Sequence, residues 1–387
     1  MKSLQQSFVV PFTYRVFFTE DIFEEKNHIL KGLINKSSDE KIIVIFDETV
    51  LCKSSHLLAD TNKYFNKNLP GQLTEVMILP GGEAVKNEIE RVNEILEAIE
   101  RGKLSRHSYI IVVGGGALLD LAGYAASIAH RGIRLIRIPT TVLAQNDSGV
   151  GVKNSVNYFN KKNFLGCFAP PFAVINDRKF LMTLEQRDWI AGVAEAIKVS
   201  LIKDEEFFYF IKDNATALVA RNQDIMQELI YRCADLHMQH IGGDDPFECG
   251  SSRPLDFGHW AAHKLEQMDK YQIRHGEAVA VGIVLDVTIS YLRNYISQKS
   301  WHQILDCISH CGFKDILINY IPFLINNYLE LEKGLHEFRE HLGGRLTIML
   351  LCAIGKGVEV GAIESDEIIK SLRHANSYYQ KNEISRL

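Results

Sequence analysis

Residue types that could bind a metal ion occur at three places in the second half of the sequence. His259-Trp-Ala-Ala-His263 puts two imidazoles at positions i and i+4, which share one face if the segment is helical. His275 begins another long apolar segment, and Glu195 lies among residues whose types indicate burial. A carboxylate with two or three imidazoles is the typical ligand set of a catalytic Zn²⁺ with an open coordination position. Histidines at this spacing also occur without a metal, and spacing alone does not choose which three groups would bind one.

A glycine-rich turn in the first half is typical of a nucleotide site. The continuous apolar run 110–113 predicts a buried strand, and Gly114-Gly-Gly116 follows it before a helical pattern. Glycines let the backbone approach a ligand, and a helix N-terminus offers free N–H groups to a pyrophosphate. The spacing is not GxGxxG, and the alternative explanation is a tight connection between strand and helix that binds no ligand. Because Asp47 and Pro80-Gly-Gly-Glu83 also end strands, the three together favour a dinucleotide site at the carboxyl edge of a sheet.

A polar segment with several cations lies between residues 131 and 163. It contains Arg131, the run from Thr140 to Lys153, and Lys161-Lys-Asn163. A local group of cations on an acidic protein fits a small phosphorylated substrate better than a polyanion. A solvated basic face is the alternative explanation.

The pattern of apolar residues predicts two domains. Over residues 1–180 short β-rich runs alternate with helical patterns, which predicts an α/β, Rossmann-like domain. Over residues 181–387 long helical periodicity predicts an all-α domain. The expected strands are 8–18, 41–46, 73–79, 109–113, 135–138 and 172–175. The expected helices include 88–101, 185–202, 204–220, 223–240, 259–268, 275–295 and 301–311. The loop over 242–256 is long for a compact helical domain, which favours a functional role.

Composition excludes several classes of partner. The chain has 387 residues, of which 43 are Lys or Arg and 48 are Asp or Glu, giving a net charge of −5. This balance argues against nucleic acid or a membrane as the main partner. Seven scattered cysteines with no CxxC pair predict a reducing, cytoplasmic location. Pro11 and Arg15 interrupt the N-terminal segment, which is expected to be a strand rather than a signal peptide, and no apolar run approaches the length of a membrane span.

Six motifs in series resemble those of the dehydroquinate synthase-like sugar phosphate cyclases. They are GGGALLDLAG, RGIRLIRIPTTVLAQNDSGVGVK, KKNFLGCFAPP, GVAEAIKVSLI, LDFGHWAAHKLE and HGEAVAVGI, and the match runs in order over most of residues 40–360. The resemblance implies a dehydroquinate synthase-like fold, NAD and Zn²⁺ or Co²⁺ as cofactors, a small phosphorylated sugar as substrate, and a homodimer.

The resemblance also implies roles for individual residues. The implied metal ligands are Glu195, His259 and His275, with His263 in polar contact with the substrate. The implied NAD contacts are Asp47, Glu83, Lys86, Gly115, Gly116, Asp120, Thr140 and Thr141. Substrate and phosphate contacts fall on Asp147, Lys153, Asn163 and Lys198, and Arg131 is implied to act across a dimer interface. The residues expected to take part in catalysis are Asp147, Lys153, Lys198, Asp256 and His263.

The sequence departs from dehydroquinate synthases where those enzymes surround the substrate's carboxylate. Their lysine, arginine and asparagine are here Met238, Ser252 and Asp256, and Arg253 is one residue out of register. Met238 removes a charged partner, and Asp256 adds a like charge, which at about 4 Å and an effective dielectric of about 20 costs roughly 4 kcal/mol. A carboxylate does accept hydrogen bonds from hydroxyls. With GGDDPFECGSSRPLDFGHW and His263 retained, the sequence most resembles the 2-epi-valiolone synthase branch, which acts on sedoheptulose 7-phosphate.

The resemblance implies one reaction and leaves two alternatives. The implied reaction oxidises a heptulose 7-phosphate transiently with NAD⁺, eliminates phosphate, returns the hydride and closes a C7 cyclitol by an intramolecular aldol step. A 3-dehydroquinate synthase of the shikimate pathway is the first alternative, which Met238 and Asp256 disfavour. A metal-dependent polyol or alcohol dehydrogenase is the second, which the series Asp147, Lys153 and Asn163 disfavours.

Overall fold

The computed structural model describes residues 2–34, 40–159, 161–243, 246–247, 254–341 and 346–384. The chain forms two compact units. An α/β unit comprises Met1–Thr140 and Val152–Lys179, and a helical unit comprises Thr141–Gly151 and Phe180–Leu387. The helical unit therefore includes residues 141–151, which precede the boundary predicted near residue 180.

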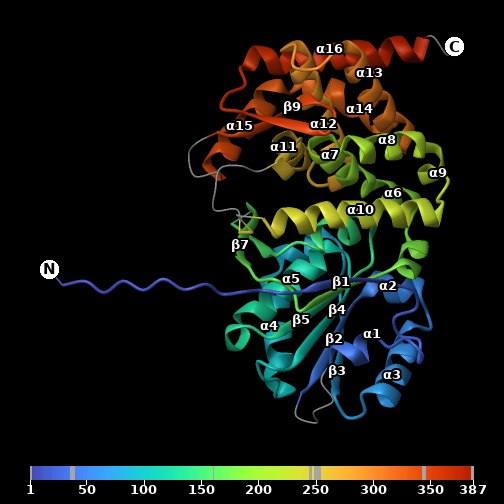
Figure 1. Cartoon of the computed structure of the whole chain (residues 1–387), viewed down its shortest axis with the longest axis vertical. Helices are drawn as coiled ribbons and strands as arrows, with labels where there is room; N and C mark the ends of the chain where they lie inside the picture. Colours follow the sequence, from blue (N-terminus) through green and yellow to red (C-terminus); the bar gives the residue numbers. More distant parts are fainter. Residues whose placement is uncertain are drawn as a thin grey trace. The chain divides into compact units, whose positions relative to one another are not determined.

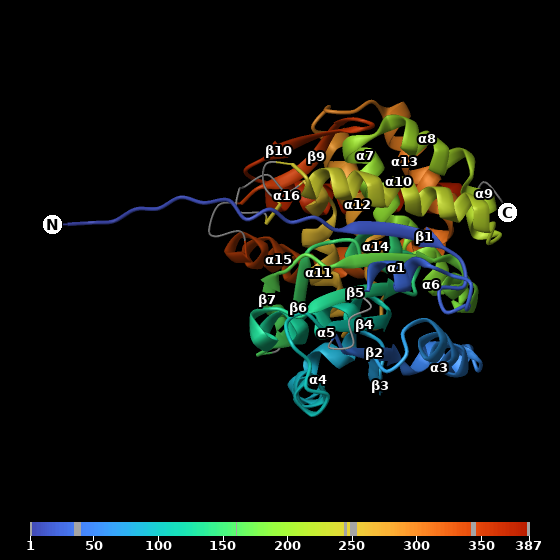
Figure 2. The same cartoon turned by 60° about the horizontal axis from the view of Figure 1, so that its bottom comes forward.

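The α/β unit is built on a six-stranded sheet in the order β1-β8-β5-β4-β2-β3, and every strand pair in it is parallel (Figures 1 and 2). The strands are β1 (Arg15–Thr19), β2 (Ile42–Asp47), β3 (Leu73–Leu79), β4 (Tyr109–Gly114), β5 (Arg134–Pro139) and β8 (Ala173–Asp177). The helices are α1 (Ile29–Leu33), α2 (Glu48–Lys53), α3 (Leu57–Asn68), α4 (Ile89–Arg101) and α5 (Gly116–Ile128), with short turns η1 (Glu83–Asn87) and η2 (Ala129–Arg131). β2, β4 and β8 are buried along their whole length, as a covered parallel sheet requires. The predicted α/β architecture is confirmed.

Two features of the α/β unit differ from the prediction. The strand expected over 8–18 begins only at Arg15, because its partner β8 begins at Ala173, the residue that pairs with Arg15. An antiparallel hairpin of β6 (Lys153–Tyr158) and β7 (Lys161–Phe168) was not predicted. The hairpin packs on α5 at Gly123, where a Cβ would lie 1.8 Å from Asn154 Oδ1, so this glycine is required for the close approach.

The helical unit is assembled around α12, which packs against α7, α11, α13, α14 and α16 (Figures 1 and 2). Its helices are α6 (Gln186–Ala191), α7 (Val193–Lys203), α8 (Glu205–Asp213), α9 (Ala215–Val219), α10 (Gln223–Ile241), α11 (His259–Met268), α12 (His275–Leu292), α13 (Gln298–Ile308), α14 (Lys314–Asn326), α15 (Tyr328–His341) and α16 (Ser365–Ile384), with turns η3 (Ala144–Ser148), η4 (Arg178–Thr183, which begins in the α/β unit), η5 (Pro254–Asp256) and η6 (Ser309–Phe313). By length and composition α12 could cross a membrane, but 83% of it is buried within the protein, as in the core helix of a globular domain.

The helical unit also contains details that periodicity did not predict. A hairpin of β9 (Ile348–Ala353) and β10 (Lys356–Val360) accompanies the helices. The helix expected over 185–202 divides at Gly192, where a Cβ would lie 2.4 Å from the backbone nitrogen of Leu143. The glycine thus lets the segment 141–151 approach the start of α7. The helix expected over 204–220 likewise divides, at Asn214.

Candidate active site

Three helices of the helical unit bring the predicted metal-binding residues together. α7 carries Glu195, α11 carries His259 and His263, and α12 begins with His275. Ligand atoms of the three histidines lie within 4.8 Å of one another. Glu195 Oε1 lies 3.5 Å from His259 Nε2 and 3.4 Å from His275 Nε2. All four candidate groups therefore face one small volume.

The burial and charge of Glu195 fit a cation site. Its side chain is 0% exposed, and among the described residues neither carboxylate oxygen has a well-formed hydrogen bond, although Lys198 Nζ forms an ion pair with Oε2. Burial raises the pKa of Glu195, but the charge of Lys198 and the interactions with His259 outweigh burial and hold the pKa well below its usual value. A buried anionic carboxylate that faces two imidazole Nε2 atoms is the donor set of a divalent zinc-type ion.

Two interactions outside this cluster orient its histidines. His259 Nδ1 lies 3.1 Å from the carbonyl oxygen of Phe257, and His275 Nδ1 lies 3.1 Å from Glu266 Oε2. If each Nδ1 carries the proton and donates it, each Nε2 presents its lone pair to a metal. Glu266 was not among the predicted site residues. Its spacing could have indicated it, because Glu266 follows His263 by three residues on the same helical face.

Replacing Glu266 by glutamine is expected to weaken zinc affinity roughly 10- to 100-fold, because the neutral amide orients His275 less well and makes it a weaker ligand. Competition with a chromophoric chelator measures the change in Kd. Glu337→Gln is the matched control, since Glu337 pairs with Lys264 of α11 rather than with a cluster histidine. Equal zinc affinities in the two variants would contradict this role for Glu266.

A buried carboxylate fixes the start of α11. Asp286 accepts hydrogen bonds from the Gly258 N–H at 2.8 Å and from the Trp260 indole N–H at 2.9 Å. Gly258 has a φ of 76°, and its carbonyl oxygen would lie 2.0 Å from a Cβ at Gly282. These contacts hold the turn before His259 against α12. Burial raises the pKa of Asp286 to about 7, against the opposing effect of the two hydrogen bonds.

Asp286→Asn is expected to remove a pH dependence of stability. The folded protein keeps the Asp286 proton up to about pH 7, whereas the ordinary carboxyl pKa is 3.8. Between these values the unfolded chain binds fewer protons, so the contribution of Asp286 is fully present below the lower value and is lost as pH rises toward 7. Denaturant unfolding of both proteins from pH 4 to 8 measures the difference in free energy. Parallel curves would show that Asp286 does not titrate in this way.

Lys198 and Asp147 interact electrostatically with each other and with Glu195. Burial lowers the pKa of Lys198, but Glu195 and Asp147 raise it above its usual range, so the ammonium stays charged. Burial raises the pKa of Asp147, but Lys198 and His237 outweigh that effect and the pKa is lowered. The turn η3 that carries Asp147 is tied to the start of α7, because Asn146 Nδ2 donates to the carbonyl oxygen of Gly192 at 2.7 Å.

The predicted specificity positions lie on elements that pack against α7. Met238 is on α10, which packs against both α7 and η3, and Asp256 ends η5, which also packs against α7. Most of the predicted loop 242–256, including Ser252 and Arg253, lies outside the described residues. Thr141, predicted to contact NAD, belongs to the helical unit, where its Oγ1 accepts from the Ala144 N–H at 3.1 Å.

In the α/β unit, the other predicted NAD residues gather where strands end. Asp47 is the last residue of β2, and its side chain accepts from the Thr49 N–H at 2.8 Å. Gly81, after β3, lies so close that a Cβ there would be 2.1 Å from an Asp47 oxygen, and Gly82 has a φ of 85°. Gly115 caps α5 directly after β4, and Gly116 begins that helix. Glycines and a helix N-terminus at one sheet edge form a cradle that fits a pyrophosphate.

A buried lysine links this edge to the β6–β7 hairpin. Lys86 Nζ donates to Asp120 Oδ2 at 2.8 Å, to Ser155 Oγ at 3.1 Å and to Asn163 Oδ1. Asn157 extends this network, because it accepts from the Asn163 N–H and donates to Glu83. One network thus joins four residues implied for NAD or phosphate contacts: Glu83, Lys86, Asp120 and Asn163. Thr140 is buried, and its N–H donates to the Gly114 carbonyl. Lys153 and Arg131 are exposed.

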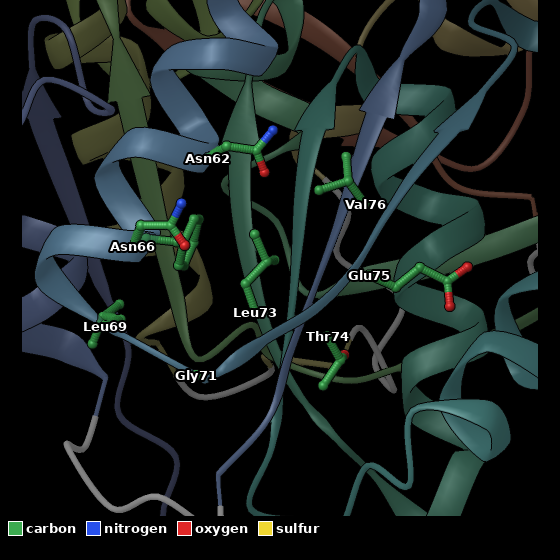
Figure 3. A pocket seen from close by; sticks show the side chains of 9 residues that line it. Asn62, Asn66, Leu69, Gly71, Leu73, Thr74, Glu75 and Val76 are labelled. Atoms are coloured by element: carbon green, nitrogen blue, oxygen red, sulfur yellow. The ribbon is translucent and has the colours of Figure 1, made fainter.

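A hollow of about 310 Å³ lies elsewhere on the α/β unit, between α3 and β3 (Figure 3). Figure 3 shows Asn62 and Asn66 on the helix side and Thr74 and Glu75 on the strand side. The strand residues that line it begin β3, whereas Asp47 and the glycines lie at the carboxyl ends of their strands. Because ligands of parallel sheets bind at the carboxyl ends, this hollow is not the cofactor cradle.

Two family models match consecutive parts of the chain. The 3-dehydroquinate synthase N-terminal model matches residues 76–191, and the 3-dehydroquinate synthase C-terminal model matches residues 192–331. The chain belongs to the 3-dehydroquinate synthase family. The resemblance seen in its motifs is therefore confirmed at the level of the family.

One named relative is similar to this chain in sequence, and two solved structures are similar to it in fold. The 3-dehydroquinate synthase of Alkaliphilus metalliredigens (strain QYMF) is 33% identical over 86% of this chain and 91% of its own length. The 2-epi-5-epi-valiolone synthase of Streptomyces hygroscopicus subsp. jinggangensis 5008, with NAD⁺ and Zn²⁺ bound, superposes with a TM-score of 0.84 at 24% identity over 97% of this chain and all of that one. A 2-deoxy-scyllo-inosose synthase complexed with carbaglucose-6-phosphate, NAD⁺ and Co²⁺ has a TM-score of 0.77 at 24% identity over 93% of this chain and 96% of that one.

Proposed function

We propose that this chain is an NAD- and divalent-metal-dependent sugar phosphate cyclase that acts on an uncarboxylated heptulose 7-phosphate, sedoheptulose 7-phosphate, to form a C7 cyclitol such as 2-epi-valiolone. The buried Glu195 carboxylate, which faces His259 Nε2 and His275 Nε2 beside the Lys198 ammonium, is the observation that carries the proposal. Family membership favours this reaction class over a polyol dehydrogenase.

The residues present fit both cofactors of the two solved relatives, which bind NAD⁺ with Zn²⁺ and NAD⁺ with Co²⁺. Glu195, His259 and His275 would hold the metal, with His263 at its side. Asp47, Gly115 and Gly116 would contribute to NAD binding in the α/β unit. When bound, the metal supplies polarisation of substrate oxygens and NAD supplies reversible hydride transfer.

The chain's own residues would bind and orient the substrate. Lys198 keeps its charge through Glu195 and Asp147, so its ammonium can bind an anionic oxygen of the substrate. Asp147 stays ionised and accepts a hydrogen bond from a substrate hydroxyl. His263 is suited to hydrogen bond to the substrate, because a neutral imidazole has one donor and one acceptor nitrogen. Lys153 and Asn163 keep their predicted role as phosphate ligands of the α/β unit.

Met238 and Asp256 support an uncarboxylated substrate. The elements that carry both residues pack against α7, the helix of Glu195 and Lys198. A carboxylate at 256 would repel a substrate carboxylate by roughly 4 kcal/mol at about 4 Å, and methionine at 238 offers no compensating charge. The hydroxyl end of sedoheptulose 7-phosphate would meet an acceptor instead of a like charge.

A phosphate-release assay with NAD⁺ and Zn²⁺ tests the proposal. We expect inorganic phosphate from sedoheptulose 7-phosphate, without net NADH, and NMR of the product identifies the cyclitol stereoisomer. Phosphate release only from the carboxylated heptulosonate 7-phosphate would overturn the proposed substrate. Net NADH accumulation with a simple polyol would instead indicate a dehydrogenase.

A 3-dehydroquinate synthase is the second candidate. Relatives that are 30–33% identical over most of the chain carry that name. The same assay separates the two candidates, since they differ in whether the substrate bears a carboxylate. The homodimer, the action of Arg131 across it and the cytoplasmic location stay predictions.

A further inference from the structure

A histidine that the motifs did not indicate is paired with Asp147. His237, on α10, places Nδ1 2.8 Å from Asp147 Oδ1. The two side chains are only 14% and 22% exposed, and they are 90 residues apart in the sequence. His237 also directly precedes Met238, one of the two proposed specificity positions.

The surroundings of this pair make the orientation of Asp147 important. Asp147 lies in η3, which packs against α7 and α10. The charged and titratable groups that act on it are Lys198 and Glu195 from α7 and His237 from α10, and Cys233, one turn before His237, interacts with the same group. Lys198 attracts the Asp147 carboxylate and Glu195 repels it, and neither interaction is directional. A directed N–H donor fixes the orientation of the carboxylate.

We propose that His237 is a positioning residue that holds the Asp147 carboxylate for hydrogen bonding to a substrate hydroxyl. The inference rests on the proposed cyclase function. The imidazole Nδ1–H donates to Oδ1, which leaves Oδ2 to accept the hydroxyl. Nδ1 is therefore the ring nitrogen that orients Asp147. Nε2 lies toward Gly151, where a Cβ would be 3.5 Å away from it.

Three substitutions separate the two ring nitrogens. Asparagine places an amide N–H close to the position of Nδ1, glutamine places its amide closer to Nε2, and leucine has no donor. We expect His237→Asn to retain kcat/KM within about threefold of the wild type. We expect His237→Leu and His237→Gln to lower it roughly 10- to 100-fold, as for the loss of a hydrogen bond to a charged group.

The measurements are kcat and KM for sedoheptulose 7-phosphate with NAD⁺ and Zn²⁺, zinc content, and the thermal unfolding midpoint of each variant. Rescue by asparagine alone, with zinc content unchanged, supports positioning through Nδ1. Equal kcat/KM in the asparagine and leucine variants, or rescue by glutamine rather than asparagine, would overturn it. The variants are compared on whichever heptulose phosphate the wild type turns over. An inactive wild type refutes the proposed function. An active wild type whose variants keep the same kcat/KM refutes only the role of His237.

Discussion

Glu195→Gln is expected to abolish stoichiometric zinc binding and to lower kcat roughly 10³-fold or more. The substitution keeps the shape of the side chain but removes the anionic ligand that faces His259 and His275. A metal that stabilises transition-state charge by several kcal/mol corresponds to at least this factor in rate. Zinc content after gel filtration and kcat for phosphate release measure the two effects.

His263→Asn is the comparison that decides which groups bind the metal. The histidine trio alone satisfies the geometry of a metal site, so His263 competes with Glu195 as the third ligand. If Glu195 is the ligand, His263→Asn keeps its zinc and loses activity. Zinc retained by Glu195→Gln but lost from His263→Asn would assign the site to the three histidines.

A double variant distinguishes loss of the zinc ligand from loss of folding. Lys198 is 3% exposed and pairs with Glu195, so Glu195→Gln leaves a buried ammonium without its principal partner. Removing one member of a buried ion pair destabilises strongly, whereas replacing both is often tolerated. Glu195→Gln with Lys198→Met therefore restores stability while still removing the zinc ligand. Zinc loss in this folded protein is the expected result.

The substitutions Met238→Lys and Asp256→Asn together are expected to shift preference toward the carboxylated heptulosonate 7-phosphate. Removing a like charge and adding an opposite one changes the interaction with a carboxylate by about 4 kcal/mol or more, which is roughly 10³-fold in relative kcat/KM. The ratio of kcat/KM for the two substrates measures the shift. The single variants show whether the two positions act independently.

Gln239→Lys is the matched control for this switch. It adds the same charge to α10 one residue further along, at an exposed position. A general electrostatic effect of an added lysine would appear equally in this variant. An unchanged substrate ratio in the double variant, or an equal shift in Gln239→Lys, would mean that Met238 and Asp256 do not form the specificity pocket.

Most of the sheet and the principal helices were predictable, because local patterns specify them. Fully buried strands such as Tyr109–Gly114 read as continuous apolar runs, and α11 and α12 begin at the predicted histidines. The β6–β7 and β9–β10 hairpins were missed. Each is a two-stranded sheet outside the main one, stabilised by packing on helices such as α5 rather than by a strong period of its own.

The division of the expected helix 185–202 also shows that local patterns do not determine every element. Its apolar period is continuous, so pattern alone predicts one helix. The close approach of Leu143 at Gly192 ends the first segment and starts the second. Here a contact between residues almost fifty positions apart overrides a local preference. A short stretch of sequence contains no sign of such a contact.

The sequence by itself determined the family, the cofactor-type residues and the candidate ligands, because motif spacing and residue chemistry are local properties. Only the tertiary structure decided that Glu195 meets His259 and His275, that Glu266 orients His275, and that Asp286 and His237 hold Gly258 and Asp147. His237 and Asp286 lie outside the six motifs, and Glu266 ends one of them without a role that the motif implied. Their roles arise when helices pack and buried polar groups must find partners, and that pairing is a property of the folded chain alone.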